Sequence, residues 1–208
     1  MKPLAVAFVL GAALTTAAGA AAPTLTLASS ATVVSYGKPV TLSGQLTGGK
    51  PNQTVAVDGT LCGTTRAAKV TSAKTTATGA YSAAVTPTGG TSYRATYKNV
   101  TSPAVAVAVR PLLALTKSGT TWTAKVTAGQ ALTGKAVLFQ RYVKKTKRWK
   151  QVKRVLLGTS TPGPARPTVV SSVTFTARLA RGTRVRLAIS TAQAAPCYVA
   201  ATSASLRA

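Results

Sequence analysis

Histidine and glutamate do not occur in this chain of 208 residues, and aspartate occurs once, at Asp58. These side chains carry most of the proton transfer, metal binding and glycoside cleavage that enzymes perform. Glycoside hydrolysis in its usual form needs two carboxylates, and two cysteines without histidine cannot complete a four-ligand zinc site. A calcium site built on Asp58 and carbonyl groups would be weak. The composition therefore predicts a protein that is not an enzyme and that uses no cofactor and no metal.

The scarcity of acids also leaves the charge of the chain one-sided. Twenty-six Lys and Arg residues give a formal net charge of +25. Seven of them lie between positions 21 and 98 together with Asp58, whereas eighteen lie from Arg110 onward without any acid. The second half therefore carries most of the charge, and the partners we expect are anionic or neutral.

Long hydrophobic runs are missing beyond the N-terminal segment. Residues 1–20 combine Lys2, an apolar run from Leu4 to Leu14, and Ala18-Gly19-Ala20, a pattern that a signal peptidase cuts. No later stretch reaches the roughly 20 apolar residues that a transmembrane helix needs. We therefore expect cleavage after Ala20 and no transmembrane segment in the mature chain. The expected location is secreted or extracellular, either free or associated with the cell surface.

Short segments of alternating apolar and polar residues fill the rest of the chain, as in Val55 and Val57 or Val137 and Phe139. The pattern restarts after Arg110-Pro111 and continues through Val152 and Val155, with a last strand from about Tyr198. The segments are separated by expected turns: Tyr36-Gly37-Lys38-Pro39, Asp58-Gly59, Thr78-Gly79 and Gly89-Gly90. No helix is expected outside the N-terminal segment. The sequence therefore predicts an all-β fold with two tandem antiparallel β-sandwiches after a signal peptide (1–20), namely domain 1 (21–110) and domain 2 (111–208).

Longer stretches of the sequence carry a family resemblance. The segments LTLASSATVVSYGKPVTLSGQL, TGAYSAAVTPTGGTSYRATYKN and TSPAVAVAVRP resemble the bacterial immunoglobulin-like modules of secreted and surface proteins. KAVLFQRY, RWKQVKRV and APCYVAATS resemble the companion domain of small two-domain secreted proteins. The resemblance implies an immunoglobulin-like fold, an extracellular place and a role in spacing, adhesion or envelope binding. It supplies no catalytic residues, and a fold by itself does not establish a function.

Two short motifs are similar to those of penicillin-recognising serine enzymes. Ser35-Tyr36-Gly37-Lys38 fits S-x-x-K, and Lys117-Ser118-Gly119 fits K-[ST]-G. The nucleophilic serine of those enzymes belongs at the start of a helix in a pocket, whereas both segments here are predicted turns between strands. A motif without its structural context is mostly a chance match.

The two cysteines, Cys62 and Cys197, suggest a disulfide, because an exported protein meets an oxidising environment. The expected strand directions place Cys62 after the third strand of domain 1 and Cys197 in a late loop of domain 2, both at the junction of the domains. Two buried free thiols, or disulfides between molecules, remain the alternatives.

Basic residues are concentrated in RYVKKTKRWKQVKR, where eight of them fall between Arg141 and Arg154. The expected topology makes this segment a hairpin at the end of domain 2 that is farthest from domain 1. A second basic group around Arg184 and Arg186 is expected on the neighbouring strand, and Tyr142 and Trp149 flank the hairpin tip. The candidate polyanion-binding residues are Arg141, Lys144, Lys145, Lys147, Arg148, Lys150, Arg184 and Arg186.

Two interpretations of this surface remain open. It can simply keep the protein soluble, or it can bind a polyanion. The expected ligand is an anionic cell-envelope polymer or surface glycan, and the expected function is adhesion, envelope binding or structural spacing. The alternative is an extracellular binder of nucleic acid or another anionic polymer, although nonspecific nucleic-acid binding follows from such a charge without any dedicated motif. The oligomeric state does not follow from the sequence.

Overall fold

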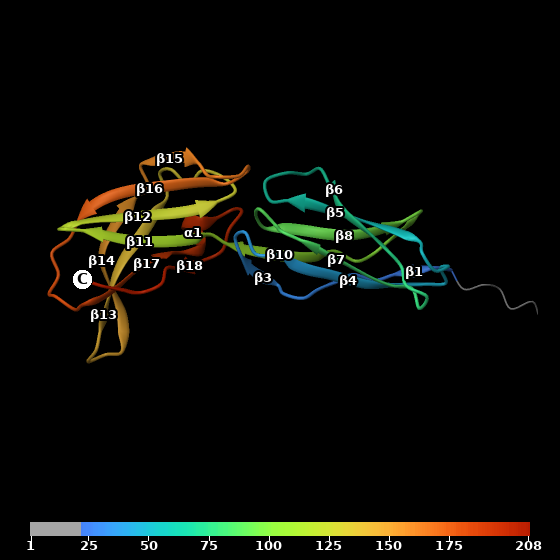
Figure 1. The fold of residues 1–208 in the computed structure, drawn as a ribbon, viewed down its shortest axis with the longest axis horizontal. Coiled ribbons are helices and arrows are strands. Elements are labelled where there is room, and N and C mark those ends of the chain that lie inside the picture. The colour runs from blue at the N-terminus through green and yellow to red at the C-terminus, as the bar shows by residue number, and fades with distance from the viewer. Residues whose placement is uncertain (1–21) are drawn as a thin grey trace, which may run out of the picture.

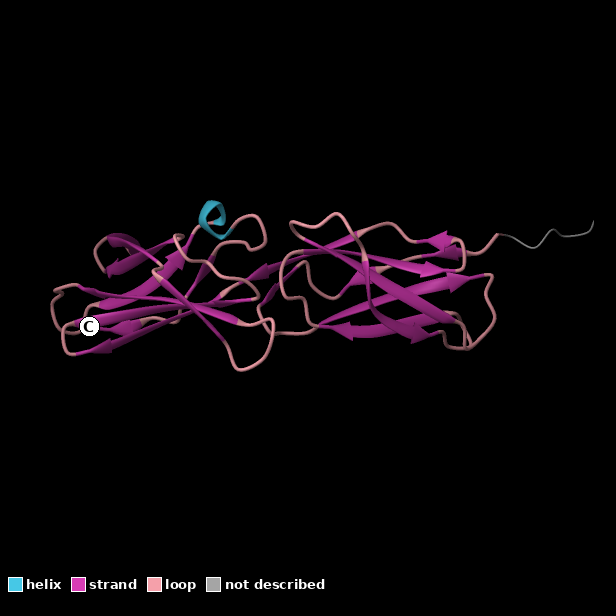
Figure 2. Cartoon of the chain, turned by 90° about the horizontal axis from the view of Figure 1, so that it is seen from above, coloured by secondary structure: helices cyan, strands magenta, loops and turns pink. Residues whose placement is uncertain are grey.

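The computed structural model describes residues 22–208, and the predicted signal peptide lies outside this described part. Two strand-rich bodies lie end to end, as Figure 1 and the view from above in Figure 2 both show. The last strand of the first body ends at Arg110, and the first strand of the second begins at Leu112. Each body is an antiparallel sandwich of two sheets, as the alternating pattern predicts.

The first sandwich packs a sheet with the order β1-β4-β2, with β7 also paired to β4, against a sheet with the order β3-β10-β8-β5-β6. Its strands are β1 (Thr24–Leu25), β2 (Ala28–Ser29), β3 (Val33–Ser35), β4 (Val40–Thr47), β5 (Thr54–Leu61), β6 (Ala68–Lys74), β7 (Ala80–Val85), β8 (Thr91–Tyr97), β9 (Val100–Thr101, paired to β8) and β10 (Val105–Arg110). One pairing departs from the antiparallel expectation. The chain crosses between sheets after β2, so β3 lies parallel to β10.

The second sandwich packs the order β11-β12-β16-β15 against β14-β13-β17-β18, with β19 also paired to β17. Its strands are β11 (Leu112–Ser118), β12 (Thr121–Ala128), β13 (Ala136–Val143), β14 (Arg148–Leu156), β15 (Thr159–Pro162), β16 (Val169–Thr176), β17 (Arg184–Ile189), β18 (Ala201–Thr202) and β19 (Leu206–Arg207). Two such sheets with this connectivity make an immunoglobulin-like sandwich.

Each sandwich encloses its own apolar core. In the first, Leu42, Val55 and Val57 are fully buried. In the second, Trp122 packs on Phe139 with ring centroids 5.0 Å apart, and Phe139 packs on Phe175 at 5.1 Å. Because these residues lie on alternate positions of their strands, the period-two pattern identified the buried faces correctly.

The Asp58-Gly59 pair is not a turn, contrary to the expectation from its composition. Both residues lie inside β5, just after a β-bulge between Val57 and Asp58. The glycine serves close packing, because a Cβ at Gly59 would lie 2.8 Å from a methyl carbon of Val70. The strand therefore continues to Leu61, directly before Cys62.

Val152 is exposed rather than buried with Val155. The register between β13 and β14 pairs Phe139 with Lys153 and Gln140 with Gln151, so Val152 is the extra residue of a bulge. A single inserted residue reverses the faces of the residues that precede it. The bulge therefore separates the core-facing end of β14 from its solvent-facing part.

A short helix, α1 (Thr191–Ala194), follows β17, although no helix is expected there. Ser190 caps it by accepting a hydrogen bond from the backbone N–H of Gln193, and the Gln193 side chain accepts from the N–H of Ala136 at 2.7 Å. The sequence Ser190 to Gln193 fits the S-x-x-Q capping pattern. The four residues of α1 are too few to show a helical period in the sequence. Within residues 22–208, no helix is long and apolar enough to cross a membrane.

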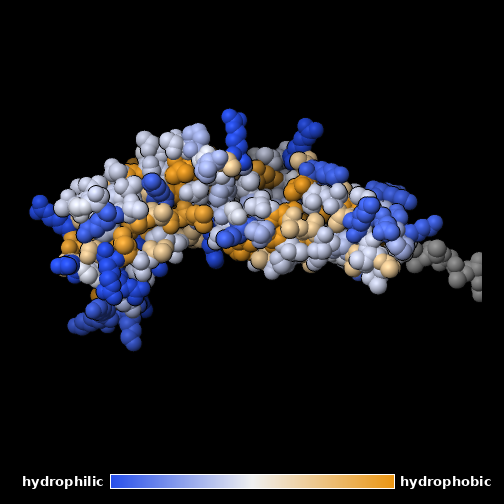
Figure 3. All heavy atoms as spheres, in the orientation of Figure 1, coloured by the Kyte–Doolittle hydropathy of each residue, from blue (hydrophilic) through white to orange (hydrophobic). Residues whose placement is uncertain are grey.

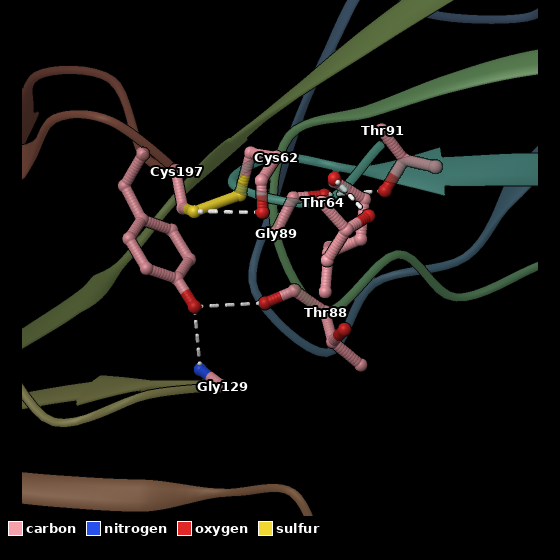
Figure 4. The surroundings of a disulfide bond; sticks show 9 residues. Cys62, Thr64, Thr88, Gly89, Thr91, Gly129 and Cys197 are labelled. Atoms are coloured by element: carbon pink, nitrogen blue, oxygen red, sulfur yellow. Dashed lines mark hydrogen bonds between the residues drawn. A yellow bond between two sulfur atoms is a disulfide. The ribbon is translucent and has the colours of Figure 1, made fainter. Parts of the chain in front are cut away.

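The sandwiches are joined by a disulfide between Cys62, directly after β5, and Cys197, between α1 and β18 (Figure 4). Their Cα atoms are 5.2 Å apart, within the range that a disulfide spans. This is the pairing inferred from the strand directions, and it excludes the two free thiols. The bond closes a loop over a sequence separation of 135 residues.

Hydrogen bonds across the same junction support the disulfide. The Gly90 N–H donates to the Cys197 carbonyl at 2.8 Å. The Tyr198 hydroxyl donates to the Thr88 carbonyl at 2.9 Å and accepts from the Gly129 N–H at 2.8 Å, so it links both sandwiches. Burial raises the pKa of Tyr198, which keeps this hydroxyl protonated at neutral pH. The junction is therefore a packed, hydrogen-bonded contact and not a free linker.

Candidate anion-binding surface on the second sandwich

The basic hairpin is formed by β13 and β14, and its turn lies at residues 144–147, with the Lys147 N–H donating to the Lys144 carbonyl at 3.3 Å. Lys144, Lys145 and Lys147 are all exposed, as are Arg141, Arg148 and Lys150. Figure 1 shows the hairpin projecting sideways from the second sandwich, across the long axis of the molecule and near the end that is far from the first sandwich. In Figure 3 strongly hydrophilic side chains gather at this end of the molecule. The hairpin tip therefore presents its charge to solvent.

The second basic group lies beside the hairpin, because β17 pairs with β13 and places Arg186 opposite Gln140. Arg184 and Arg186 are two positions apart on β17 and share one face of the sheet. The Arg186 side chain donates through Nε to the Gln140 Oε1 at 2.9 Å. The structure thus brings together the two basic segments that are more than thirty residues apart in the sequence.

An arginine–aromatic cluster, comprising Tyr142, Trp149, Arg184 and Arg186, covers this face. The two rings form a cross-strand pair with centroids 5.3 Å apart. The Arg186 guanidinium lies 4.3 Å from the Trp149 centroid, and that of Arg184 lies 5.4 Å from the Tyr142 centroid. Such contacts stabilise a cation over an aromatic face. They also restrict the side-chain freedom of both arginines.

Trp149 is neither a core residue nor an open stacking platform. It lies half-buried on the outer face of the sheet, with Arg186 against its ring and Tyr142 against its edge. Burial lowers the pKa of Arg186, but an arginine stays protonated under all ordinary conditions. The cluster therefore offers fixed guanidinium groups more readily than free aromatic faces.

Not all candidate residues converge on this cluster. Arg148 and Lys150 flank Trp149 on β14 and so point to the opposite face of the hairpin. Lys145 and Lys147 occupy the tip. The candidate residues therefore form a charged end of the molecule with one ordered part, the face that carries Arg184 and Arg186.

Sequence reasoning missed Arg207, which pairs in register with Arg184 through β19. A two-residue strand near the end of the chain has no periodic signal, and its pairing with β17 is nonlocal. Gln140 was also missed as the partner of Arg186, because only the strand register places it there.

The only side-chain carboxylate of the chain lies in the other sandwich. Asp58 accepts a hydrogen bond from the Thr96 hydroxyl at 3.1 Å, in β5. The basic residues of the second sandwich, from Lys117 onward, have no acidic side chain on their own sandwich to neutralise them. Their positive field therefore acts on external groups.

Each of the two serine-enzyme motifs begins at the end of a strand and runs into a turn between strands. Ser35 ends β3, and its carbonyl accepts from the Lys38 N–H at 3.0 Å across a turn in which Gly37 has a φ of 78°. Lys117 and Ser118 end β11. Neither serine lies at the start of a helix, which is the place that the motif requires.

Comparison with known proteins identifies no family for this chain. No protein-family model matches it, and no curated protein matches it. Among solved structures it is similar to a marsupial T cell receptor at 10% sequence identity, with a TM-score of 0.33 over 88% of this chain and 62% of the receptor chain. This chain thus spans less than two thirds of the receptor's length. The description of the sandwiches therefore rests on the sheets, registers and cores of this chain itself.

Proposed function

We propose that this chain is a non-enzymatic binding protein of the cell exterior, of the bacterial immunoglobulin-like kind, and that its second sandwich binds an anionic polymer of the cell envelope. The observation that carries the proposal is the arginine–aromatic cluster at the base of a basic hairpin. Guanidinium groups held on aromatic rings lose less conformational freedom on binding than free ones, so they favour ligand contact over mere solubility.

The location at the cell exterior is supported by two observations. The Cys62–Cys197 disulfide is typical of proteins that leave the reducing cytosol, and the sequence of residues 1–20 has the pattern of a cleaved export signal. The first sandwich then acts as a spacer, because the hydrogen-bonded junction holds the basic end away from it.

Nucleic acid is the second candidate ligand. Tyr142 and Trp149 beside a basic groove are the residue types on which bases stack. Against it, the Trp149 ring is already in contact with Arg186. We therefore expect phosphate or carboxylate groups, and not bases, to be the recognised features.

The proposal is tested by measuring the binding of residues 21–208 to isolated envelope polymers and to single-stranded DNA between 50 and 200 mM salt. About six anionic contacts would lower the affinity about a thousandfold over this range, because each contact releases counterions. Undetectable binding to every envelope polymer at low salt would contradict the proposal. Binding to DNA that persists at high salt, where the envelope polymers dissociate, would favour the nucleic-acid alternative.

A further inference from the structure

A hollow of about 530 Å³ opens between the hairpin and the turn that precedes β17. Five basic residues line it: Arg141, Lys144, Arg181, Arg184 and Arg207. They come from the hairpin, from the loop before β17, from β17 itself and from β19. The register pairs Arg141 with the buried Val185, so Arg141 approaches from the other face of the sheet than Arg184. A hollow lined by cationic residues from four segments differs from a convex charged tip, because a single small anion can approach more than one of them.

Backbone hydrogen bonds fix the positions of two of these residues in the chain. Arg181 lies in a turn closed by the Thr183 N–H to the Ala180 carbonyl at 3.1 Å, with Gly182 at a φ of 79°. Few residues other than glycine adopt this left-handed conformation readily. Beside this turn, Arg207 is held by the pairing of β19 with β17, and the Ala208 N–H donates to the Thr183 carbonyl at 2.8 Å. The rim is therefore built by defined local structure.

Arg184 follows this turn as the first residue of β17, in register with Arg207, and is also restrained. It lies over the Tyr142 ring and donates through Nη2 to the Ser205 hydroxyl at 3.2 Å. One contact of this kind leaves most of the five guanidinium N–H donors free. Two nearby backbone donors are already used, since the Gly182 N–H donates to the main-chain oxygen of the last residue, Ala208, at 2.9 Å and the Thr183 N–H donates to the Ala180 carbonyl at 3.1 Å. A ligand in the hollow is therefore bound by side-chain donors.

We propose that this hollow binds individual phosphate groups of a phosphodiester-linked polymer that carries no stacked bases, such as a polyol phosphate. The proposal rests on the proposed function and specifies its ligand. Arginines that approach from several segments suit a tetrahedral group, whose oxygens point in several directions. A planar carboxylate is satisfied by one guanidinium fork. We expect the polymer to carry no bases, because Arg184 and Arg186 already lie over the aromatic rings on which bases would stack.

The test measures the affinity of three proteins for each of three polymers of equal length at one salt concentration. The proteins are residues 21–208, the hollow variant R181Q/R207Q, and the tip variant K145Q/K147Q, which removes the same charge from exposed residues that do not line the hollow. The polymers are poly(glycerol phosphate), polygalacturonate and single-stranded DNA. Circular dichroism and thermal melts establish that all three proteins are folded.

We expect the unchanged protein to bind poly(glycerol phosphate) about tenfold more tightly than polygalacturonate, the size of about one charge-assisted hydrogen bond. The hollow variant should lose this preference. The tip variant should bind both polymers more weakly by the same factor, so it should keep the preference. Equal affinities for the two polymers, or equal losses in the two variants, would overturn the phosphate site and leave the proposed function intact. Tighter binding of DNA than of poly(glycerol phosphate) would overturn the base-free ligand. Failure of every polymer to bind would instead refute the proposed function.

Discussion

Replacing Lys144, Lys145, Lys147 and Arg148 together by serine should lower the affinity for an anionic polymer by up to about a thousandfold at 0.1 M salt. The salt dependence should flatten at the same time, since each lost contact removes roughly 0.7 to 0.9 from the slope of log affinity against log salt. All four side chains are exposed at or beside the hairpin turn, so the fold should be unaffected. Binding measured at three or more salt concentrations gives both quantities, and a thermal melt checks the fold.

The matched control for this variant lies on the first sandwich. Lys38, Lys50, Lys69 and Lys74 are also exposed, and their replacement by serine removes the same charge. We expect only a small loss of affinity from this control, through the reduced long-range field. Equal losses in the two variants would mean that net charge alone drives binding and that the hairpin is no site.

Among the variants described, the joint replacement of Cys62 and Cys197 by serine should lower the free energy of unfolding most. The chain-entropy model gives up to about 4 to 5 kcal/mol for a closed loop of more than a hundred residues. The actual loss should be smaller, because most buried residues of each sandwich pack within that sandwich, although Tyr36 and Val109 of the first also pack into the core of the second. The Tyr198 and Gly90 hydrogen bonds should hold the junction in part.

Thermal unfolding of the variant and of the unchanged protein, with and without reductant, measures this effect. The unchanged protein in reductant should melt close to the variant, and the variant should not respond to reductant. Limited proteolysis should cut the variant near the junction more rapidly. Peptide mapping that finds free thiols at both positions in protein purified without reductant would contradict the junction described here.

The buried faces of both sandwiches could be predicted from the sequence, because alternation in a sheet follows directly from the pleat. The sequence-based predictions were wrong at two places, where one residue changed the local geometry of a strand. Asp58-Gly59 has the composition of a turn but lies in a strand, since Gly59 is required for packing. Val152 is placed outside by a bulge that no composition signal marks.

For the candidate site, the sequence located the basic segments and the junction cysteines but not the ordered contacts. The position of β17 beside β13 follows from the topology of the fold, so the proximity of Arg184 to the hairpin was predictable. The stacking of Arg186 on Trp149 and the approach of Arg207 depend on strand register and on a nonlocal pairing. Such details are set by tertiary structure and leave no periodic pattern in the sequence.

The proposed anionic polymer would lie at one end of the molecule, around the hairpin of β13 and β14. Lysine acetylation of the unchanged protein, followed by mass spectrometry with and without poly(glycerol phosphate), tests this placement most directly, because every lysine is probed in one sample. We expect Lys144, Lys145, Lys147 and Lys150 to become protected from acetylation, while Lys38, Lys50, Lys69 and Lys74 keep their reactivity. Equal protection of the two sets would contradict this placement.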